Sequence, residues 1–533
     1  MAKGKLSFKV KDEGPIPTPK EVNNWRIILL AIAASLGGLC YGYDLGFIGS
    51  TLALPAFESY FGTDSRGAAY RSMLESNIVA IFQAGCCFGS FMAVPLSDKF
   101  GRKIAILVTA FVFNLGAVLM CAATASHALN MVYAGRVLTG WSIGATSMLV
   151  PVYIGECAPA SLRGRLVGVY EVAIQAGTAA GFWIGYIFLK AVHEESSAQW
   201  RGPMGIQLVP GVALNVAMLF LTETPRYMAK AHNEVRAAET LSYLRNLPMD
   251  HPYVQAELAG IVEQVENERA ATAGSGRFQV LRETFGPNNR VRLFKAVTLM
   301  IFFQFSGTNA INYYSPKIFA NLGFKGTSVK LFATGVYGIV RTVATIISML
   351  FFTDRFGRVS MLMCGGGIMA ICMWIVGALI AVYPASPGGQ IVPGQYAAIT
   401  LIYVYAVAFC FSYAGIPWIY CSEIFPLRIR SFNVAITTFT HWAFNLCIAK
   451  SVPYMIANIK YGTYFVFAAM LTLGFIWTYF FLPETKGVAL EDMDELFNGS
   501  SRAEQTEKRL HDKAETGTVS HRETVDEKDG ESV

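Results

Sequence analysis

The sequence of 533 residues has little charge, because only 15% of its residues are Asp, Glu, Lys or Arg, whereas 53% are hydrophobic. A soluble protein of this length would need far more charge to cover its surface. The formal net charge of +6 comes without a basic patch interleaved with aromatic residues, which argues against a nucleic-acid partner. The composition therefore predicts a protein embedded in a lipid bilayer.

Several sequence motifs are also missing. There is no CxxC pair, and all ten cysteines fall in or at the ends of apolar runs, which is typical of small core residues. The nucleotide loop GxxxxGK[ST] and the enzyme motifs HExxH and GxSxG are absent, which argues against an ATP-driven pump and against a membrane enzyme. We expect no catalytic residues, no cofactor and no metal site. The first 25 residues are charged and contain three prolines, unlike the apolar core of a cleaved signal peptide.

Long apolar runs are what the sequence does contain. Runs of roughly 18 to 25 residues cross a hydrocarbon core of about 30 Å, and twelve can be found, near residues 26–50, 74–97, 103–124, 128–155, 165–189, 203–221, 293–321, 327–352, 359–383, 395–424, 430–456 and 461–482. The expected fold is an all-α membrane protein with twelve transmembrane helices in two six-helix bundles. Its domains would be an N-terminal tail, a first bundle, linker helices, a second bundle and a mostly disordered tail, over residues 1–25, 26–221, 222–292, 293–482 and 483–533.

Lys and Arg fall on one side of this even-numbered topology. They are frequent in the N-terminal tail, in the 226–295 region and in the short loops near residues 99–103, 163–165, 355–358 and 428–430. Loops that stay in the cytosol carry such an excess of positive charge. We therefore predict a multi-pass protein with both termini in the cytosol.

Acidic and basic anchors occur twice in the same order. Asp98 and Gly101-Arg102 recur as Asp354 and Gly357-Arg358, and two further acids recur in the same way, Glu156 as Glu423 and Glu223 as Glu484. The offset of about 260 residues is nearly constant and indicates an internal duplication. Transporters with a binding site between two repeats are built in this way. The duplication therefore points to solute transport.

The repeated charges suggest a gate at the cytosolic ends of the helices. A carboxylate at a helix end can pair with an Arg of a neighbouring helix in one state and release it in another. The alternative is that these are ordinary basic loops beside the spans. The residues predicted to act in gating are Asp98, Arg102, Glu156, Arg163, Glu223, Arg226, Asp354, Arg358, Glu423 and Arg430, with Arg165 and Arg428 as further partner charges.

From about residue 24 to 497 the chain resembles the sugar porter family of the major facilitator superfamily. The matching motifs are Gly135-Arg136, Pro151 to Gly164, Glu223-Thr224-Pro225-Arg226, Gln304 with Gly307 and Asn309, Tyr313-Tyr314, Ser422 to Pro426, and Pro483 to Gly487. Within that family, Asn24-Trp25-Arg26, Gly42-Tyr43-Asp44 and Thr51 to Pro55 look most like fungal quinate permeases and their sugar-acid relatives, of the galacturonate type.

The resemblance implies a set of residues that bind a polyol. Amides offer both a donor and an acceptor, as hydroxyl groups do, and aromatic rings suit the apolar face of a sugar ring, although without the family they would equally suggest helix packing. The implied contacts are Gln304, Asn309, Tyr313, Trp418, Trp442 and Asn445. Three departures mark the pocket as unlike that of a glucose carrier: Glu171 and His441 stand where amides are usual, and Phe303 replaces one glutamine of a common pair.

Arg341 is an anomaly in the eighth run, some thirteen residues before Asp354. At a rise of about 1.5 Å per residue it lies on the order of 20 Å from the boundary, too deep for easy snorkelling. A buried cation in a membrane is a functional hypothesis by default, and guanidinium matches a substrate carboxylate. The alternative is a structural pair with Glu171. Lys450 could draw anions in, or it could be an interface lysine.

Asp44 lies in the middle of the first run. The resemblance implies that it pairs with Arg136 and carries the coupled proton, since a carboxylate that alternates between two environments can take up and release a proton. Purely structural pairing is the alternative.

Together these features predict a proton-coupled symporter in the fungal plasma membrane that imports quinate or a hexuronic acid such as galacturonate by alternating access. A neutral hexose or pentose carrier is the alternative, and a transporter-like nutrient sensor is a further one. The expected partners are a small-molecule substrate, protons and the lipid bilayer, with the monomer as the working unit.

Overall fold

The structure is a computed structural model that describes residues 18–124, 127–272, 277–353, 355–384, 392–486 and Phe497. Within those ranges the regular secondary structure is entirely helical. The tail predicted to be disordered, from residue 498 onward, lies outside the described residues, as does the N-terminal tail before residue 18.

Six membrane-spanning segments form the first half of the chain. Two of them consist of a pair of consecutive helices, and the short helices η1 (Lys20–Val22) and α3 (Pro55–Phe61) lie on either side of the first segment. The segments are α1 (Trp25–Ala34) with α2 (Leu36–Leu52), α4 (Ala68–Phe100), α5 (Arg102–Cys121), α6 (Ala128–Cys157), α7 (Arg163–Ala191), and α8 (Ala198–Ile206) with α9 (Leu208–Phe220).

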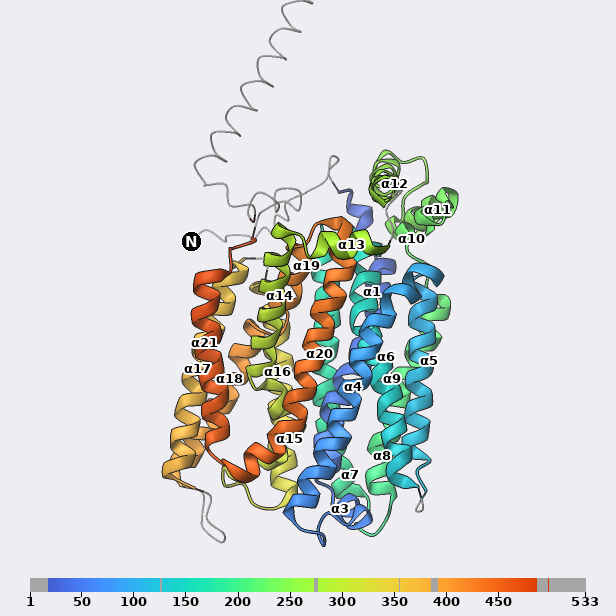
Figure 1. Ribbon diagram of the computed structural model, residues 1–533. Coiled ribbons are helices and arrows are strands. Elements are labelled where there is room, and N and C mark those ends of the chain that lie inside the picture. The colour runs from blue at the N-terminus through green and yellow to red at the C-terminus, as the bar shows by residue number, and fades with distance from the viewer. Residues whose placement is uncertain are drawn as a thin grey trace, which may run out of the picture.

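Four short helices follow, as the mixed-charge sequence predicts: α10 (Pro225–Lys230), α11 (Glu234–Arg245), α12 (Pro252–Thr272) and α13 (Arg277–Thr284). They gather at one end of the molecule, at the top of Figure 1, which we call the linker end. The buried Arg245 fastens α11 and α12 to this end, because it bonds the carboxylate of Glu257 at 2.6 Å and the carbonyl of Cys157 at 2.8 Å. The opposite end, where α3 lies, we call the far end.

Six further segments form the second half. They are α14 (Pro287–Phe305) with α15 (Thr308–Asn321), α16 (Thr327–Phe351), α17 (Arg358–Val382), α18 (Pro393–Phe411) with α19 (Ile416–Glu423), α20 (Leu427–Asn458) and α21 (Gly462–Phe481). The twelve predicted segments are therefore confirmed, with ends that differ from the predicted ones by a few residues.

Two of the twelve segments are less apolar than the rest. In the described part of the chain, ten helical stretches are long and apolar enough to cross a membrane. The two others, α14 with α15 and α20, carry amide and imidazole side chains such as Gln304, Asn309 and His441 in their middle. The run predicted at 293–321 is moreover two helices, because Gly307 adopts a left-handed φ of 92° between them. Polar side chains and a helix break thus coincide in the seventh segment, as in transporter binding sites.

The two halves pack against each other with an approximate two-fold symmetry. In Figure 1 the blue-to-teal helices of the first half stand beside the yellow-to-red helices of the second. The main contacts between them are α4 with α20 and α7 with α16, that is, second segment with eleventh and fifth with eighth. If the two halves are exchanged, the second segment takes the place of the eighth and the eleventh takes the place of the fifth. One of these contacts then becomes the other. The internal repeat found in the sequence is therefore also a repeat of packing.

Close backbone contact within the first half depends on glycine. A Cβ atom at Gly42 of α2 would lie 1.8 Å from the backbone carbonyl oxygen of Ile174 in α7, and one at Gly46 would lie 2.3 Å from that of Thr178. Backbone atoms cannot move aside as a side chain can. The backbones of α2 and α7 can therefore approach this closely only because Gly42 and Gly46 have no side chain. Small residues let transmembrane helices approach in this way.

We expect Gly42→Ala to destabilise the first half. An inserted methyl group that forces packed atoms apart costs about 1–3 kcal/mol, so the thermal midpoint of the detergent-purified protein should fall. Gly260→Ala on α12 is the matched control, because a Cβ there meets nothing within 4 Å. Equal midpoints for the two variants would contradict this account of α2 and α7.

Candidate functional site

A buried ion pair lies in the first half. The guanidinium of Arg136 on α6 bonds one carboxylate oxygen of Asp44 on α2, and both side chains have no solvent exposure. Arg136 also donates from Nε to the carbonyl of Ile78 at 3.2 Å. The second oxygen of Asp44 and one amino group of Arg136 have no hydrogen-bond partner. The structure thus brings the two predicted residues together and leaves each with unused hydrogen-bonding capacity.

One aromatic ring connects this pair to the second half. The guanidinium carbon of Arg136 lies 4.3 Å from the centre of the Phe82 ring on α4. The Trp442 ring on α20 meets the same Phe82 ring edge-on at 6.3 Å, and it lies 5.3 Å from Tyr41 of α2. Trp442 is fully buried. Trp442 therefore lies between the halves, and its contact with Phe82 connects the second half to Arg136.

A chain of polar side chains crosses the second half. Arg341 of α16 donates to Asn312 Oδ1, and Asn312 Nδ2 lies 3.4 Å from Asn309 Oδ1. Asn309 Nδ2 then donates to Gln304 Oε1 at 2.8 Å, and Gln304 Nε2 lies 2.8 Å from His441 Nδ1. All five side chains are buried. The prediction named four of these residues; Asn312, which joins Arg341 to the rest, was missed.

Three neighbouring residues on α20 have polar atoms without a partner. These are His441 Nε2, Trp442 Nε1 and Asn445 Oδ1, whereas Asn445 Nδ2 donates to the Tyr313 hydroxyl at 3.1 Å. Trp418 of α19 covers the imidazole of His441, with the ring centres 4.7 Å apart. Buried polar atoms without partners are rare in folded proteins. They are the atoms to which a hydroxylated ligand could bind.

Phe303 and Glu171, two of the departures from the family pattern, lie in different surroundings. Phe303 packs against the imidazole of His441 with ring centres 4.9 Å apart, so the replaced glutamine becomes part of an aromatic wall. Glu171 of α7 accepts from Gln175 Nε2 at 2.9 Å. Glu171 and Arg341 form no ion pair with each other within the described part of the chain, so the suggested structural pair is not formed in this conformation.

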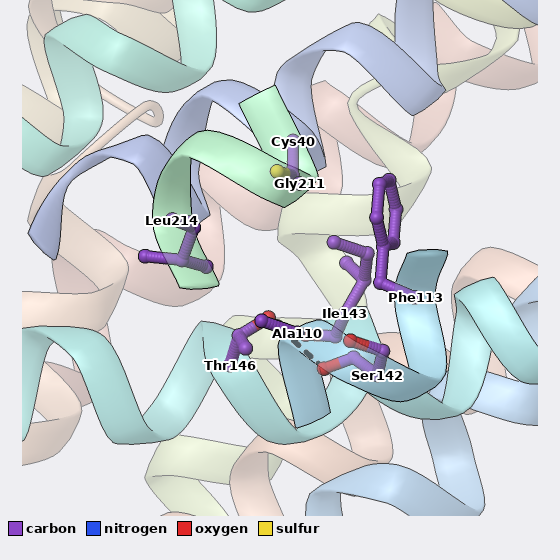
Figure 2. Close-up of a pocket in the computed structure, with 9 residues that line it drawn as sticks. Cys40, Ala110, Phe113, Ser142, Ile143, Thr146, Gly211 and Leu214 are labelled. Atoms are coloured by element: carbon purple, nitrogen blue, oxygen red, sulfur yellow. Dashed lines mark hydrogen bonds between the residues drawn. The ribbon is translucent and has the colours of Figure 1, made fainter. Parts of the chain in front are cut away.

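Figure 2 shows a crevice that lies apart from these residues. It is enclosed by α2, α5, α6 and α9 and is lined mainly by small and apolar groups such as Cys40, Phe113 and Ile143. The hydroxyls beside it, Ser142 and Thr146, donate to backbone carbonyls. No water molecule fits into it. We interpret it as imperfect packing within the first half and not as a ligand site.

In the first half, the repeated charged residues gather around the N-terminus of α5 and cap it. Arg102 of α5 bonds Glu156 of α6 at 3.1 Å and lies 3.8 Å from Asp98. Glu223 accepts hydrogen bonds from the first backbone N–H groups of α5, at Arg102 and Lys103. Burial raises the pKa of Glu223, and these backbone donors oppose the shift. A Cβ on Gly101, whose φ is 91°, would lie 2.3 Å from Glu223 Oε2, so glycine is required there.

The second half repeats this cap almost atom for atom. Arg358 bonds Glu423 at 3.1 Å, and Glu484 accepts from the backbone N–H groups of Arg358 at 2.7 Å and Val359 at 3.1 Å. Thr485 donates to Glu423 at 2.8 Å, just as Thr224 donates to Glu156 at 2.7 Å. Asp354 lies outside the described residues. Both clusters join helices of the same half.

Some gating partners differ from the expected ones. Glu156 bonds Arg102, and Glu423 bonds Arg358. Arg430 donates to the carbonyl of Phe425, about one turn before it, and Arg163 is solvent-exposed and forms no ion pair within the described part of the chain. Arg226 pairs with Glu268 of α12. The pairs of Glu156 and Glu423 each join helices of one half, α5 with α6 and α17 with α19.

A second charged cluster lies at the far end and was not predicted. Glu58 of α3 and Glu75 of α4 both bind Arg71. Lys317 of α15 completes the cluster by pairing with Glu75, and Lys450 of α20 bonds Asn77. Burial raises the pKa of Glu58, and the charge of Arg71 opposes that shift. Lys317 and Lys450 belong to the second half, so these contacts join the halves.

The comparison with protein families decides the identity of the fold. The profile described as "Sugar (and other) transporter" matches residues 30–497. The chain belongs to the sugar porter family. It is thus a membrane transporter of the major facilitator superfamily and not an enzyme.

Relatives and solved structures agree with this membership. The chain is 41% identical to a "Probable quinate permease" of Aspergillus niger over 90% of this chain and 89% of that protein. A protein with the same name from Aspergillus oryzae is 41% identical over 90% of each chain. The proton:xylose symporter XylE bound to 6-bromo-6-deoxy-D-glucose superimposes with a TM-score of 0.74 at 25% identity, covering 89% of this chain and 99% of that one. Partially occluded, inward-open XylE from E. coli gives 0.72 at 24%, covering 87% and 99%.

The two ends of this sugar porter differ in how the halves meet. At the far end Lys317 and Lys450 reach across to α4, and α15 packs against α2. At the linker end the Arg102 and Arg358 clusters bond within their own halves. The conformation described is therefore one in which charged contacts hold the far end closed.

We expect Lys317→Gln to favour opening at the far end. Glu75 is almost fully buried and would lose its partner across the interface. We expect the equilibrium between the closed and open far end to shift about tenfold, which corresponds to about 1.4 kcal/mol. This free energy lies between the contributions of exposed and of buried ion pairs. The measurement is labelling of a cysteine introduced at Ser76 by an impermeant maleimide. The matched control is Lys460→Gln, an exposed lysine in the turn that follows α20, which should leave the labelling rate unchanged. Equal rates in both variants would contradict a role of the Lys317–Glu75 pair in closing the far end.

Proposed function

We propose that this sugar porter imports a hydroxylated monocarboxylate, of the quinate or hexuronate type, together with a proton. The observation that carries the substrate class is the group of buried donors and acceptors on α20, at His441, Trp442 and Asn445, which have no partner in the part of the chain that the structure describes. Ring hydroxyls and a carboxylate would use such atoms, and Trp418 beside His441 offers an apolar face. The names of the relatives at 41% identity support the same class.

Positive charge near the site supports an anionic substrate. Arg341 is 3% exposed and has no carboxylate partner within the described residues, so its charge is balanced only by amides and by the rings of Tyr337 and Phe409. A buried cation costs several kcal/mol unless some group compensates it. An anion bound nearby would lower that cost. The charge of Arg341 therefore favours a carboxylate over a neutral sugar.

The carboxyl group of Glu171 would repel the carboxylate of an anionic substrate, and it therefore determines how the substrate is oriented. Its carboxyl group accepts from Gln175 and lies on α7, in the half opposite to His441. We propose that the hydroxyl groups of the substrate face Glu171 and Gln175 and that the carboxylate faces α20. A neutral hexose or pentose would use the same hydroxyl contacts, which is why it remains the alternative substrate.

Proton coupling is assigned to Asp44 with Arg136. A carboxyl group can carry a proton across the membrane if the arginine is drawn away from it in one conformation. Phe82 offers the route for that movement, because it contacts both Arg136 and Trp442. A substrate that displaces Trp442 would thus disturb the ion pair. XylE, to which the chain is 25% identical, is named as a proton:xylose symporter.

The remaining proposals concern location and organisation. We propose a plasma-membrane carrier that works as a monomer, with both termini and α10–α13 in the cytosol, because the basic loops gather at the linker end. The halves that move are residues 26–221 and 293–482. A sensor that binds without transport is the second candidate, and uptake of labelled substrate distinguishes the two.

We predict that the parent protein, expressed in yeast without its own carriers, takes up quinate or galacturonate in preference to glucose and xylose. The physical reason is the unbalanced charge of Arg341 beside buried hydrogen-bonding atoms. Initial uptake rates of the four labelled compounds are the measurement. Rapid uptake of glucose or xylose with none of either acid would make the protein a neutral sugar carrier.

We predict that Asp44→Asn abolishes accumulation against a gradient but retains exchange. A monocarboxylate and one proton together move no net charge, so the driving force is the pH difference, at about 1.4 kcal/mol per pH unit. An amide at position 44 cannot carry the proton that couples uptake to this difference. Uptake with and without an uncoupler measures the driving force, and counterflow in proteoliposomes measures exchange. Thr139→Val on α6, whose hydroxyl bonds the backbone carbonyl of Arg136, is the control. Unchanged accumulation in Asp44→Asn would assign the proton to another group.

A further inference from the structure

The polar chain of the second half has a direction. A guanidinium group can only donate hydrogen bonds, so the atom of Asn312 that faces Arg341 must be its oxygen. The amide nitrogen of Asn312 is then directed at Asn309 and must meet an oxygen there. One residue that cannot accept thus orients the first amide, and each amide orients the next.

The direction continues to the imidazole. With its oxygen facing Asn312, Asn309 presents its nitrogen to Gln304 Oε1 at 2.8 Å, and Gln304 presents its own nitrogen to His441 Nδ1 at 2.8 Å. Nδ1 must therefore accept, and it carries no proton. A neutral imidazole then has its proton on Nε2. That nitrogen is buried and has no hydrogen-bond partner among the residues that the structure describes.

We propose that Arg341 is a positioning residue that fixes His441 as the Nε2–H tautomer, and that this N–H donates to the carboxylate of the substrate. Asn312, Asn309 and Gln304 transmit the orientation. Arg341 therefore does not need to touch the substrate to favour an anion. The inference rests on the proposed function, because it assigns the atom that receives the acid group.

The same face of α20 supplies the complementary atom. Asn445 lies four residues after His441, so the two side chains share one side of the helix. Its Oδ1 has no partner, because Nδ2 is the atom that donates to Tyr313. A donor and an acceptor one turn apart fit a carboxylate and a hydroxyl group on one ring. A hydroxy acid satisfies both atoms, whereas a neutral polyol needs no fixed donor at His441.

The chain can be reversed by one substitution. Asn312→Asp keeps an acceptor for Arg341 but has no N–H for Asn309, so Asn309 and Gln304 must turn over and present an oxygen to His441 Nδ1. His441 would then hold its proton on Nδ1, and Nε2 would become an acceptor that repels a carboxylate. We expect the KM for the acid to rise about tenfold, the value of one hydrogen bond to a charged group, with little change for a neutral polyol.

The test uses the full-length protein in proteoliposomes, with labelled quinate as the acid and labelled inositol as the neutral polyol. Arg341→Gln should raise the KM for quinate about tenfold. His441→Leu removes the Nε2–H donor altogether, and in that background Arg341→Gln should add nothing. Thr334→Val is the control on α16, because its hydroxyl bonds the backbone carbonyl of Lys330 and takes no part in the chain.

Two results would overturn the inference. One is a full tenfold effect of Arg341→Gln in the His441→Leu background, which would mean that Arg341 binds the substrate itself. The other is an equal change of both KM values in Asn312→Asp, or no change in either, which would mean that the chain has no direction. If Arg341→Gln fails to reach the membrane, Asn312→Asp decides the question alone. If the parent carries only a neutral sugar, the proposed function fails, and the same double substitution measured with that sugar still tests the coupling.

Discussion

A polar group in the interior of a bilayer has no water to bind, so the protein itself must satisfy it. This constraint accounts for the main features of the structure. Asp44 and Arg136 pair with each other, and Arg136 uses a backbone carbonyl and an aromatic ring for the rest of its charge. Arg341 has no acid beside it and instead engages the amides that lead to His441. Among the buried polar atoms that have no partner within the described residues are His441 Nε2, Trp442 Nε1 and Asn445 Oδ1, on the helix that packs against α4 of the first half.

The two halves keep the repeat at their ends and lose it in the middle. At the linker end both halves have the same arginine, the same two carboxylates and the same threonine, at nearly equal distances. In the interior, the first half holds an ion pair and the second half holds a chain of amides. In the proposed function, the interior of the first half carries the proton and the interior of the second half recognises the substrate.

Much of this arrangement could be predicted from the sequence, and the missing parts share a cause. The twelve segments, the repeat and most polar residues of the interior follow from composition, spacing and family resemblance. The partner of Arg341 does not, because Glu171 was the nearest carboxylate by expectation, whereas Asn312 lies closer in space. The cluster of Glu58, Arg71, Glu75 and Lys317 was missed because it joins residues far apart in the chain, and only the packing of α15 against the first half brings Lys317 there.

The caps at the linker end also bear on how the protein is made. The start of α5 is capped by Glu223, which follows 121 residues later, and the start of α17 by Glu484, which follows 126 residues later. Each capping glutamate comes directly after the last membrane segment of its half. A nascent chain therefore cannot satisfy the first N–H groups of α5 or α17 until the whole half has left the ribosome and entered the membrane. Each cap therefore forms only in a half whose last membrane segment is already in place.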